Sequence, residues 1–382
     1  MRVVWATQVY PRRRGDVLGG FLHRLARELP AHGIEVTVVA PEAEGAPARE
    51  RLDDVDVVRF PLASPAARSL AYTGEMHRVA TRSPLAVPEF LRAFRRAISS
   101  EIAKATLVHA HWWIPTGLAA MGSARAAGRP YVVSLHGTDV RLLERWTIAR
   151  PFAARVLGRA RVVLPVSEFL AEPVRRWVPP ERLTVLPMPV DADTFSARSA
   201  PRTDELLVVA RLTKQKRVDV ALRALAILRR TEPHRTLRIC GDGPERDPLA
   251  TLARELGLED AVFFDGLVPA ERLAGLLAKA AALVAPFERE GYGLVVVEAA
   301  RCECPVVVAR SGALPEAIER DRAGWSFTPG DAEDLARAVR DVDASAPERS
   351  ERVRRARERA DRLTAAPLAA ELVRIYHGIS RS

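Results

Sequence analysis

Short runs of apolar, mostly β-branched residues alternate with amphipathic stretches along almost the whole chain. Continuous apolar runs of this kind are typical of parallel strands buried on both faces, and the stretches between them have helical periodicity. The alternation predicts a doubly wound α/β fold. In the first half it predicts strands at Arg2–Thr7, Glu35–Ala40, Val55–Phe60, Leu107–His111, Tyr131–Leu135, Val162–Val166 and Leu183–Pro187, with helices at Gly20–Leu29, Glu89–Lys104 and Pro115–Ala127.

The same alternation starts again after a polar segment at residues 196–203. It predicts strands at Glu205–Ala210, Leu237–Cys240, Val262–Phe264, Leu283–Ala285 and Val306–Ala309, with helices at Val218–Arg230 and Asp247–Leu256. The C-terminal part predicts helices at Asp331–Val339 and Pro347–Arg362, then an amphipathic helix whose apolar face holds Leu368, Leu372, Ile375 and Tyr376. We therefore expect two Rossmann-like domains with a hinge near residues 190–203, which fits 382 residues at about 150 per domain.

The net charge of +10 is distributed unevenly along the chain. Residues 1–198 contain 28 Lys and Arg against 19 Asp and Glu, whereas residues 199–382 contain 30 against 29. A basic half indicates an anionic partner, so a nucleic-acid-binding protein is one alternative. Because no nucleic-acid-binding motif accompanies the charge, we expect another anionic partner or an anionic membrane surface and no nucleic acid.

The three cysteines, Cys240, Cys302 and Cys304, are odd in number and do not form a disulfide framework. Their apolar surroundings predict buried side chains in a reducing cytosol. Cys302-Glu-Cys304 lacks partners at the spacing of metal ligands. No apolar run reaches the roughly 18–20 residues that span a bilayer. We expect a cytoplasmic protein, peripheral on the inner face of the cell membrane if the basic half binds lipid.

Two polar motifs follow predicted strands of the first half. Gly19 and Gly20 open a helix, where backbone N–H groups can bind an anion; a tight turn without a ligand is the alternative. His136-Gly137-Thr138-Asp139 follows the strand Tyr131–Leu135, at the edge where parallel sheets bind ligands. His136 is suited to a phosphate or a sugar hydroxyl, and a histidine bonded only to backbone is the alternative.

Three further motifs follow strands of the second half. Arg211 and Lys216 share one loop and suit a diphosphate, with a solvated loop as the alternative. Glu290 lies in a glycine-rich loop, and Glu298 lies in an apolar helical run where a carboxylate needs a partner. Sugar hydroxyls would supply that partner, and a salt bridge is the alternative. Gly241-Asp242-Gly243 is similar to a dinucleotide fingerprint, but a non-glycine residue ends it, so we expect no dinucleotide cofactor.

Glu290 and Glu298, with seven residues between them, match the E-x7-E signature of glycosyltransferase family 4. Over essentially the whole chain the order of the other motifs resembles the same family, whose members are retaining, nucleotide-sugar-dependent enzymes of the GT-B fold. These motifs are Gly19-Gly20 with His23, His136-Gly137-Thr138-Asp139, Val166-Ser167-Glu168, Val190-Asp191, Arg211 with Lys216, and Gly241-Asp242-Gly243-Pro244. The resemblance implies an acceptor-binding domain at 1–195, with about 366–382 crossing back onto it, and a donor-binding domain at 196–365.

The resemblance also implies a role for individual residues. Arg211 and Lys216 would bind the diphosphate, Glu290 the hexose and Glu298 the ribose, with the donor mainly on the second domain, facing the cleft between the domains. The implied catalytic residues are Arg211, Lys216, Glu290 and His136. The implied donor-binding residues are Gly19, Gly20, Gly241, Gly243, Val268, Tyr292, Gly293, Leu294 and Glu298. Because no Asp-x-Asp stands at an evident strand end, we expect no metal and no cofactor beyond a GDP- or UDP-linked sugar substrate.

The acceptor is expected on the basic first half. The expected acceptor-binding residues are His23, His109, His111, Trp112, Trp113 and Asp139. The long stretch Pro61–Pro88 would contribute a loop. The helix that follows carries an apolar stripe that includes Phe90, Phe94 and Ile98, with arginines opposite. Such a helix either lies on a membrane surface or packs on the sheet. We expect a glycan, lipid-linked or small-molecule acceptor.

Two positions depart from the family pattern, and two other functions compete. Met188-Pro189 replaces a frequent Asn-Gly before Val190-Asp191, and Phe287 stands where a small residue is frequent. These changes affect the hinge and the hexose pocket. Another GT-B activity, such as a sugar-nucleotide epimerase or a phosphorylase, is the enzymatic alternative, and a basic nucleic-acid-binding protein is the non-enzymatic one.

Overall fold

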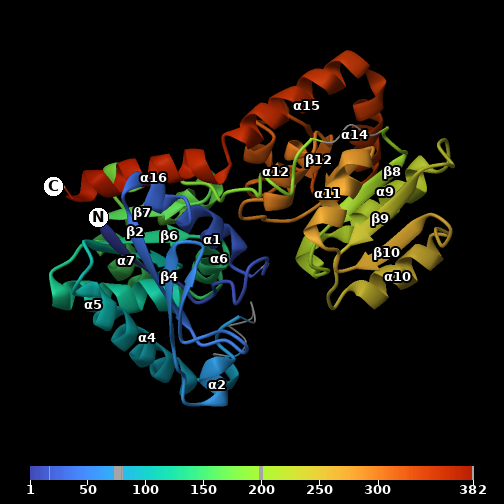
Figure 1. Ribbon diagram of the computed structural model, residues 1–382. Coiled ribbons are helices and arrows are strands. Elements are labelled where there is room, and N and C mark those ends of the chain that lie inside the picture. The colour runs from blue at the N-terminus through green and yellow to red at the C-terminus, as the bar shows by residue number, and fades with distance from the viewer. Residues whose placement is uncertain (17, 73–78, 80, 198–200, 381–382) are drawn as a thin grey trace. The chain divides into compact units, whose positions relative to one another are not determined.

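The computed structural model describes residues 1–16, 18–72, 79, 81–197 and 201–380. They form two compact units, Met1–Pro189 with Ala365–Ser382 and Val190–Thr364. Each unit is a sheet flanked by helices (Figure 1). The predicted hinge at 190–203 and the predicted acceptor loop Pro61–Pro88 lie in part outside the described residues. No helix in the described ranges is long and apolar enough to cross a bilayer.

The first unit contains a sheet in the order β3-β4-β2-β1-β5-β6-β7, parallel except at β3. Its strands are β1 (Arg2–Ala6), β2 (Glu35–Pro41), β3 (Arg49–Leu52), β4 (Val55–Phe60), β5 (Leu107–His111), β6 (Tyr131–Leu135) and β7 (Val162–Pro165). The predicted strand Leu183–Pro187 is wrong, because only Leu183 bridges to Val163 beside β7. The antiparallel strand β3 was missed, because its sequence Arg-Glu-Arg-Leu has no apolar run.

Helices cover both faces of this sheet (Figure 1). They are α1 (Gly20–Ala26), η1 (Leu29–His32), α2 (Pro65–Arg68), α4 (Ala86–Ile102), η2 (Trp113–Gly117), α5 (Leu118–Ala127), α6 (Thr138–Arg145), η3 (Thr147–Ala149), α7 (Arg150–Arg159), α8 (Glu168–Ala171), η4 (Glu172–Val174), η5 (Pro180–Arg182) and α16 (Ala365–Ser380). The last helix packs against α1 and η1, and buries Leu368, Leu372 and Tyr376 in the same core as Trp5.

The apolar stripe of α4 is part of the core. Phe90, Phe94 and Ile98 are buried, and both phenylalanine rings contact Phe60 at the end of β4. The helix packs on β1, β2 and β4, so the packed alternative applies and this stripe does not face a membrane.

The second unit contains a wholly parallel sheet in the order β10-β9-β8-β11-β12-β13. Its strands are β8 (Glu205–Val209), β9 (Thr236–Cys240), β10 (Val262–Gly266), β11 (Ala282–Ala285), β12 (Val306–Ala309) and β13 (Trp325–Phe327). Its helices are η6 (Lys214–Lys216), α9 (Val218–Leu228), α10 (Arg246–Glu255), α11 (Ala270–Lys279), α12 (Leu294–Arg301), α13 (Leu314–Ala317), α14 (Ala332–Ala344) and α15 (Ala346–Asp361). The three cysteines are buried and unbridged here, as predicted.

Arg301 ties together the two ends of the second unit. Its guanidinium donates to the carbonyl oxygens of Ala192 and Phe195 and pairs with Asp361. The backbone N–H of Val190 also donates to Leu363 O at 2.9 Å. Residues 190–195 therefore pack with the second unit. The chain enters this unit and leaves it beside α12, the helix that carries Arg301.

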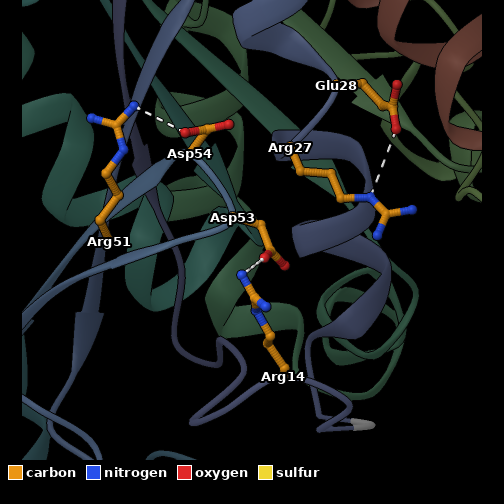
Figure 2. A pocket seen from close by; sticks show the side chains of 6 residues that line it. All are labelled: Arg14, Arg27, Glu28, Arg51, Asp53 and Asp54. Atoms are coloured by element: carbon orange, nitrogen blue, oxygen red, sulfur yellow. Dashed lines mark hydrogen bonds and ion pairs between the residues drawn. The ribbon is translucent and has the colours of Figure 1, made fainter.

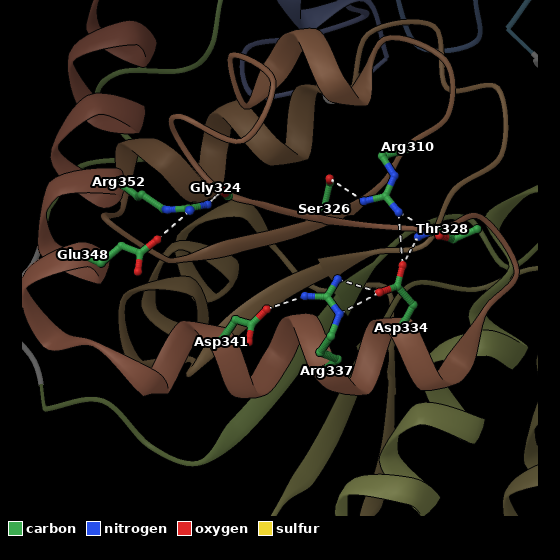
Figure 3. A network of polar contacts seen from close by, with 9 residues as sticks. All are labelled: Arg310, Gly324, Ser326, Thr328, Asp334, Arg337, Asp341, Glu348 and Arg352. Atoms are coloured by element: carbon green, nitrogen blue, oxygen red, sulfur yellow. Dashed lines mark hydrogen bonds and ion pairs between the residues drawn. The ribbon is translucent and has the colours of Figure 1, made fainter.

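A charged network holds α14 and α15 against β12 and β13 (Figure 3). Asp334 accepts from Arg310, Arg337 and the Thr328 backbone N–H, while Arg352 donates to Gly324 O. Burial opposes ionisation of Asp334, but the Thr328 and Arg337 donors hold its pKa well below the usual range. Arg310, Arg337 and Arg352 therefore hold these helices on the sheet.

Candidate active site

The predicted residues of the second unit gather where the strand order reverses. Chain order runs outward from β8 to β9 and β10, whereas β11 pairs on the other side of β8. Ligands bind outside the carboxyl ends of the strands at such a point. Arg211 follows β8 and Glu290 follows β11, so both motifs lie at this edge.

Lys216 and Glu290 form the central contact of this edge. The Lys216 Nζ lies 2.5 Å from Glu290 Oε2, and the side chains are 21% and 19% exposed. The same ammonium lies 4.2 Å from the centre of the buried Phe287 ring. An aromatic face attracts a cation, so the unusual Phe287 contributes to positioning Lys216.

The backbone around Glu290 is fixed by the loop that follows β12. The Ala313 N–H donates to Glu290 O at 2.8 Å, and Arg289 N–H donates to Ser311 Oγ at 2.8 Å. Gly312 has φ +63°, and a Cβ there would lie 2.3 Å from Glu290 O. Burial opposes ionisation of Glu290, but the Lys216 charge and the Tyr292 and Gly291 amides lower its pKa. A carboxylate is therefore maintained at this position.

Gly241 and Gly243 pack directly on the segment that carries Arg211. A Cβ on Gly241 would lie 1.8 Å from Ala210 O, and one on Gly243 would lie 2.4 Å from Leu212 O. The Leu212 N–H also donates to Asp242 O at 2.9 Å. The motif after β9 thus sets the path of the loop after β8, on which Arg211 is exposed.

The remaining donor-binding candidates lie around the start of α12 and the end of β10. Gly293 has φ +82° and precedes α12, Tyr292 is buried, and Leu294 opens the helix. Glu298 is partly exposed one turn further along. Val268 lies two residues beyond β10 and is partly exposed. All of these residues follow the carboxyl ends of β10 and β11, as the sequence predicts.

In the first unit, His136 and Asp139 form a compact turn after β6. One Asp139 carboxylate oxygen accepts from the His136 and Gly137 N–H groups, and the other accepts from the Trp113 N–H at 3.3 Å. Burial raises the Asp139 pKa to about 6, against these donors. Burial also lowers the His136 pKa to about 3, so this imidazole is neutral at physiological pH.

His109 and His111 lie side by side at the end of β5, next to His136. The His111 Nδ1 is 3.2 Å from His136 Nε2, whereas His111 Nε2 and His136 Nδ1 are buried with no hydrogen-bond partner. The His109 nitrogens contact Tyr376 and Ser134. Trp112 lies 4.6 Å from the His136 ring, and Trp113 is fully buried.

The glycine turn before α1 lies beside the tyrosine that anchors His23. Gly19 has φ +75°, and a Cβ there would lie 3.0 Å from the Tyr10 Cα. His23 Nδ1 lies 2.8 Å from the Tyr10 hydroxyl and Nε2 lies 3.0 Å from Asp53 Oδ2. Both ring nitrogens of His23 are therefore engaged within the protein.

Sequence reasoning missed an open pocket of about 620 Å³ that is lined in part by Asp53, the partner of His23. Figure 2 shows the side chains that line it. It is lined by Arg14, Arg27, Glu28, Arg51, Asp53 and Asp54. Arg14 pairs with Asp53 and Arg51 with Asp54, so acids balance the cations. No spacing signal links these residues, because they come from three separate segments. Across the described residues, no group of three or more His, Cys, Asp or Glu side chains is arranged to hold a metal.

Comparison with known proteins identifies the family. Residues 191–359 match the family described as "Glycosyl transferases group 1", and residues 19–194 match "Glycosyltransferase Family 4". The chain is 30% identical over 376 residues to glycogen synthase of Mycobacterium tuberculosis, which covers 94% of this chain and 90% of that protein. This chain belongs to glycosyltransferase family 4.

A second relative agrees with the family 4 assignment, and a solved structure shows the same fold. The chain is 31% identical over 361 residues to the GDP-mannose-dependent alpha-(1-6)-phosphatidylinositol monomannoside mannosyltransferase of Mycolicibacterium smegmatis, covering 88% and 87% of the two chains. Sucrose-phosphate synthase of Thermosynechococcus elongatus has a TM-score of 0.82 at 21% identity, covering 99% and 98%. The predicted GT-B fold is confirmed, and the protein is a hexosyltransferase that uses a nucleotide-sugar donor.

Proposed function

We propose that the protein transfers a hexose, with retention at the anomeric carbon and without a metal, to a hydroxyl of a glycan, lipid-linked or small-molecule acceptor. The contact between Lys216 and Glu290 at the reversal of strand order carries the proposal. One hydrogen bond thus joins a cation that is suited to binding phosphate to a carboxylate that is suited to binding sugar hydroxyls.

Each side of this contact has a role in the proposed reaction. Arg211 and Lys216 bind the diphosphate and stabilise the charge that develops on the departing nucleotide. Glu290 accepts hydrogen bonds from hexose hydroxyls, with the Tyr292 and Gly293 N–H groups beside it. Glu298 holds the ribose hydroxyls. The nucleobase lies near Gly241–Gly243 and Val268.

The first unit supplies the acceptor site and further donor contacts. His136, whose side chain is partly exposed after β6, binds the hexose or phosphate. Gly19 and Gly20 present backbone N–H groups to the phosphate. The acceptor site is shaped by Trp112 and His111. The walls behind them are held by residues that have hydrogen-bond partners within the protein or are fully buried, namely His23, His109, Trp113 and Asp139.

We place the anionic-membrane contact on the η3–α7 surface, defined by Ile148, Phe152 and Arg155. Ile148 is 79% and Phe152 58% exposed, and they are four residues apart. Arg155 is exposed one turn further along. Large apolar side chains beside cations favour the boundary between headgroups and acyl chains of an anionic bilayer. This surface, and not the buried stripe of α4, is therefore the proposed membrane contact.

A donor panel tests the proposed function. GDP-mannose, UDP-glucose and UDP-N-acetylglucosamine are each added to the protein, and thermal stability and transfer to acceptors are measured. One donor should raise the melting temperature and yield a product with a retained anomeric configuration, because bound ligand stabilises the folded state. Conversion of the donor without an acceptor product would favour an epimerase or phosphorylase. Loss of transfer in EDTA with rescue by a divalent ion would overturn metal independence.

A further inference from the structure

We propose that Tyr376 on the last helix, α16, positions His136 through a chain of buried histidines. The Tyr376 side chain is fully buried. Its first hydrogen-bond partner, Trp5, lies 371 residues away in the sequence. Trp5 Nε1 lies 3.0 Å from the Tyr376 hydroxyl, which lies 2.5 Å from His109 Nδ1. The inference rests on the proposed contact of His136 with the donor.

The donor and acceptor in each hydrogen bond of this series follow from Trp5. An indole N–H only donates, so the Tyr376 oxygen accepts from it and the Tyr376 O–H donates onward to His109 Nδ1. His109 is fully buried, and burial lowers its pKa to about 3, which keeps the ring neutral. Its single ring proton is therefore on Nε2, which donates to Ser134 Oγ at 2.7 Å. Tyr376 thus selects one tautomer of His109.

The orientation of His109 reaches His136 through one intermediate ring. The His109 and His111 rings are stacked, with centroids 4.3 Å apart and an angle of 29°. Trp5 contacts both rings at a steep angle, with centroids 5.5 Å from His109 and 4.7 Å from His111. The buried His111 ring packs against both neighbours, and its Nδ1 lies 3.2 Å from His136 Nε2. A change in the His109 ring therefore moves the group that holds His136.

Removing the hydroxyl alone separates this role from packing. Tyr376→Phe keeps the ring in the core but leaves Trp5 Nε1 and His109 Nδ1 without a partner. The Ser134 hydroxyl can then rotate and donate to His109 Nε2, so both tautomers become available. Tyr131→Phe is the matched control, because the buried Tyr131 hydroxyl donates to Val156 O at 2.5 Å in the same unit.

Histidine-selective NMR and kinetics test the proposal together. Wild-type ¹⁵N spectra should give His109 with its proton on Nε2, and Tyr376→Phe should convert that signal to a mixture of tautomers. We expect kcat to fall about 10-fold with donor KM changed less than about 2-fold, as a misplaced active-site group would cause. Tyr131→Phe should change neither tautomer nor kcat.

Two results would overturn the proposal. One is a wild-type His109 with its proton on Nδ1, and this result can be measured without any variant. The other is Tyr376→Phe with an unchanged His109 signal and unchanged kcat. The tautomer measurement requires no substrate, so a protein that transfers none of the tested sugars would contradict the proposed function and leave the Tyr376–His109 result standing.

Discussion

Lys216 Nζ lies 2.5 Å from Glu290 Oε2, although 74 residues separate the two along the chain. Each side chain is about one-fifth exposed, and the aromatic face of Phe287 packs against the ammonium. Burial opposes ionisation of Glu290, and the Lys216 charge is the largest of the effects that lower its pKa. The pair therefore maintains both the positive and the negative group that the proposed reaction requires.

Lys216→Ala should lower kcat by about 100- to 1,000-fold, because one donor to the developing charge is lost. Lys216→Arg should restore part of the activity, because the charge is kept while the geometry changes. Lys214→Ala is the control, since Lys214 is an exposed lysine in the same short helix η6. Steady-state kinetics with the preferred donor measure all three. An equal loss in the Lys214 variant would contradict a specific role for Lys216.

Gly241→Ala should impair both folding and donor binding. The added Cβ would meet Ala210 O at 1.8 Å in a backbone with φ +136°, so the loop that carries Arg211 must move. Strain of this kind costs about 1–3 kcal/mol, and we expect a lower melting temperature and weaker donor binding.

Gly275→Ala is the control for this substitution. Gly275 lies inside α11 with no atom within 4 Å of an added Cβ. Alanine there should stabilise the helix by up to about 1 kcal/mol. Thermal unfolding and donor titration of both variants are compared. Gly241→Ala with wild-type stability and donor affinity would refute the argument from close packing.

The strands of the sheets could largely be predicted from apolar runs. The bounds of β4, β5, β6 and β12 match the prediction, because each is a short run bounded by polar residues or turns. The edge strands β3 and β13 could not. β3 is charged because one face and one edge meet solvent, and β13 has only three residues. Segment Leu183–Pro187 follows β7 with two backbone hydrogen bonds but forms a bridge only at Leu183, so it is not a strand.

The candidate site could be predicted only motif by motif. The sequence placed Lys216 and Glu290 at strand ends, but their contact depends on β8 and β11 being neighbours, which no local pattern encodes. The Ser311–Ala313 loop that fixes Glu290 carries no motif. The partners of His23 and of His109 come from 30 and 267 residues away. Such pairs follow from topology rather than from periodicity.

The buried histidines should make stability fall with acid. Burial lowers the His109 pKa to about 3 and the His111 pKa well below its usual range. Below pH ~6.5 the unfolded chain takes up these protons and the folded chain does not. The stabilisation is therefore present above pH ~6.5 and is lost toward lower pH, by about 1.4 kcal/mol per pH unit for each histidine.

Asp139 has the opposite effect on the change of stability with pH. Burial raises its pKa to about 6, so between pH ~4 and 6 the folded chain holds a proton that the unfolded chain has lost, which offsets one histidine. Denaturant unfolding from pH 7 to 4.5 measures the sum. His109→Gln should reduce the slope with pH, and Asp139→Asn should increase it. A stability that does not change over this range would contradict both assignments.

Ile148→Asn with Phe152→Asn should abolish binding to anionic vesicles. These side chains are exposed on the η3–α7 surface, and each insertion into the headgroup boundary contributes free energy in proportion to its buried apolar area. Flotation with phosphatidylglycerol vesicles should recover the wild-type protein, and neutral vesicles should recover less because Arg155 then lacks a partner. Leu85→Asn is the control, since Leu85 is 87% exposed on another part of the first unit. Equal flotation of all variants would remove this surface from the membrane argument, and loss of flotation in Leu85→Asn would move the contact toward α4.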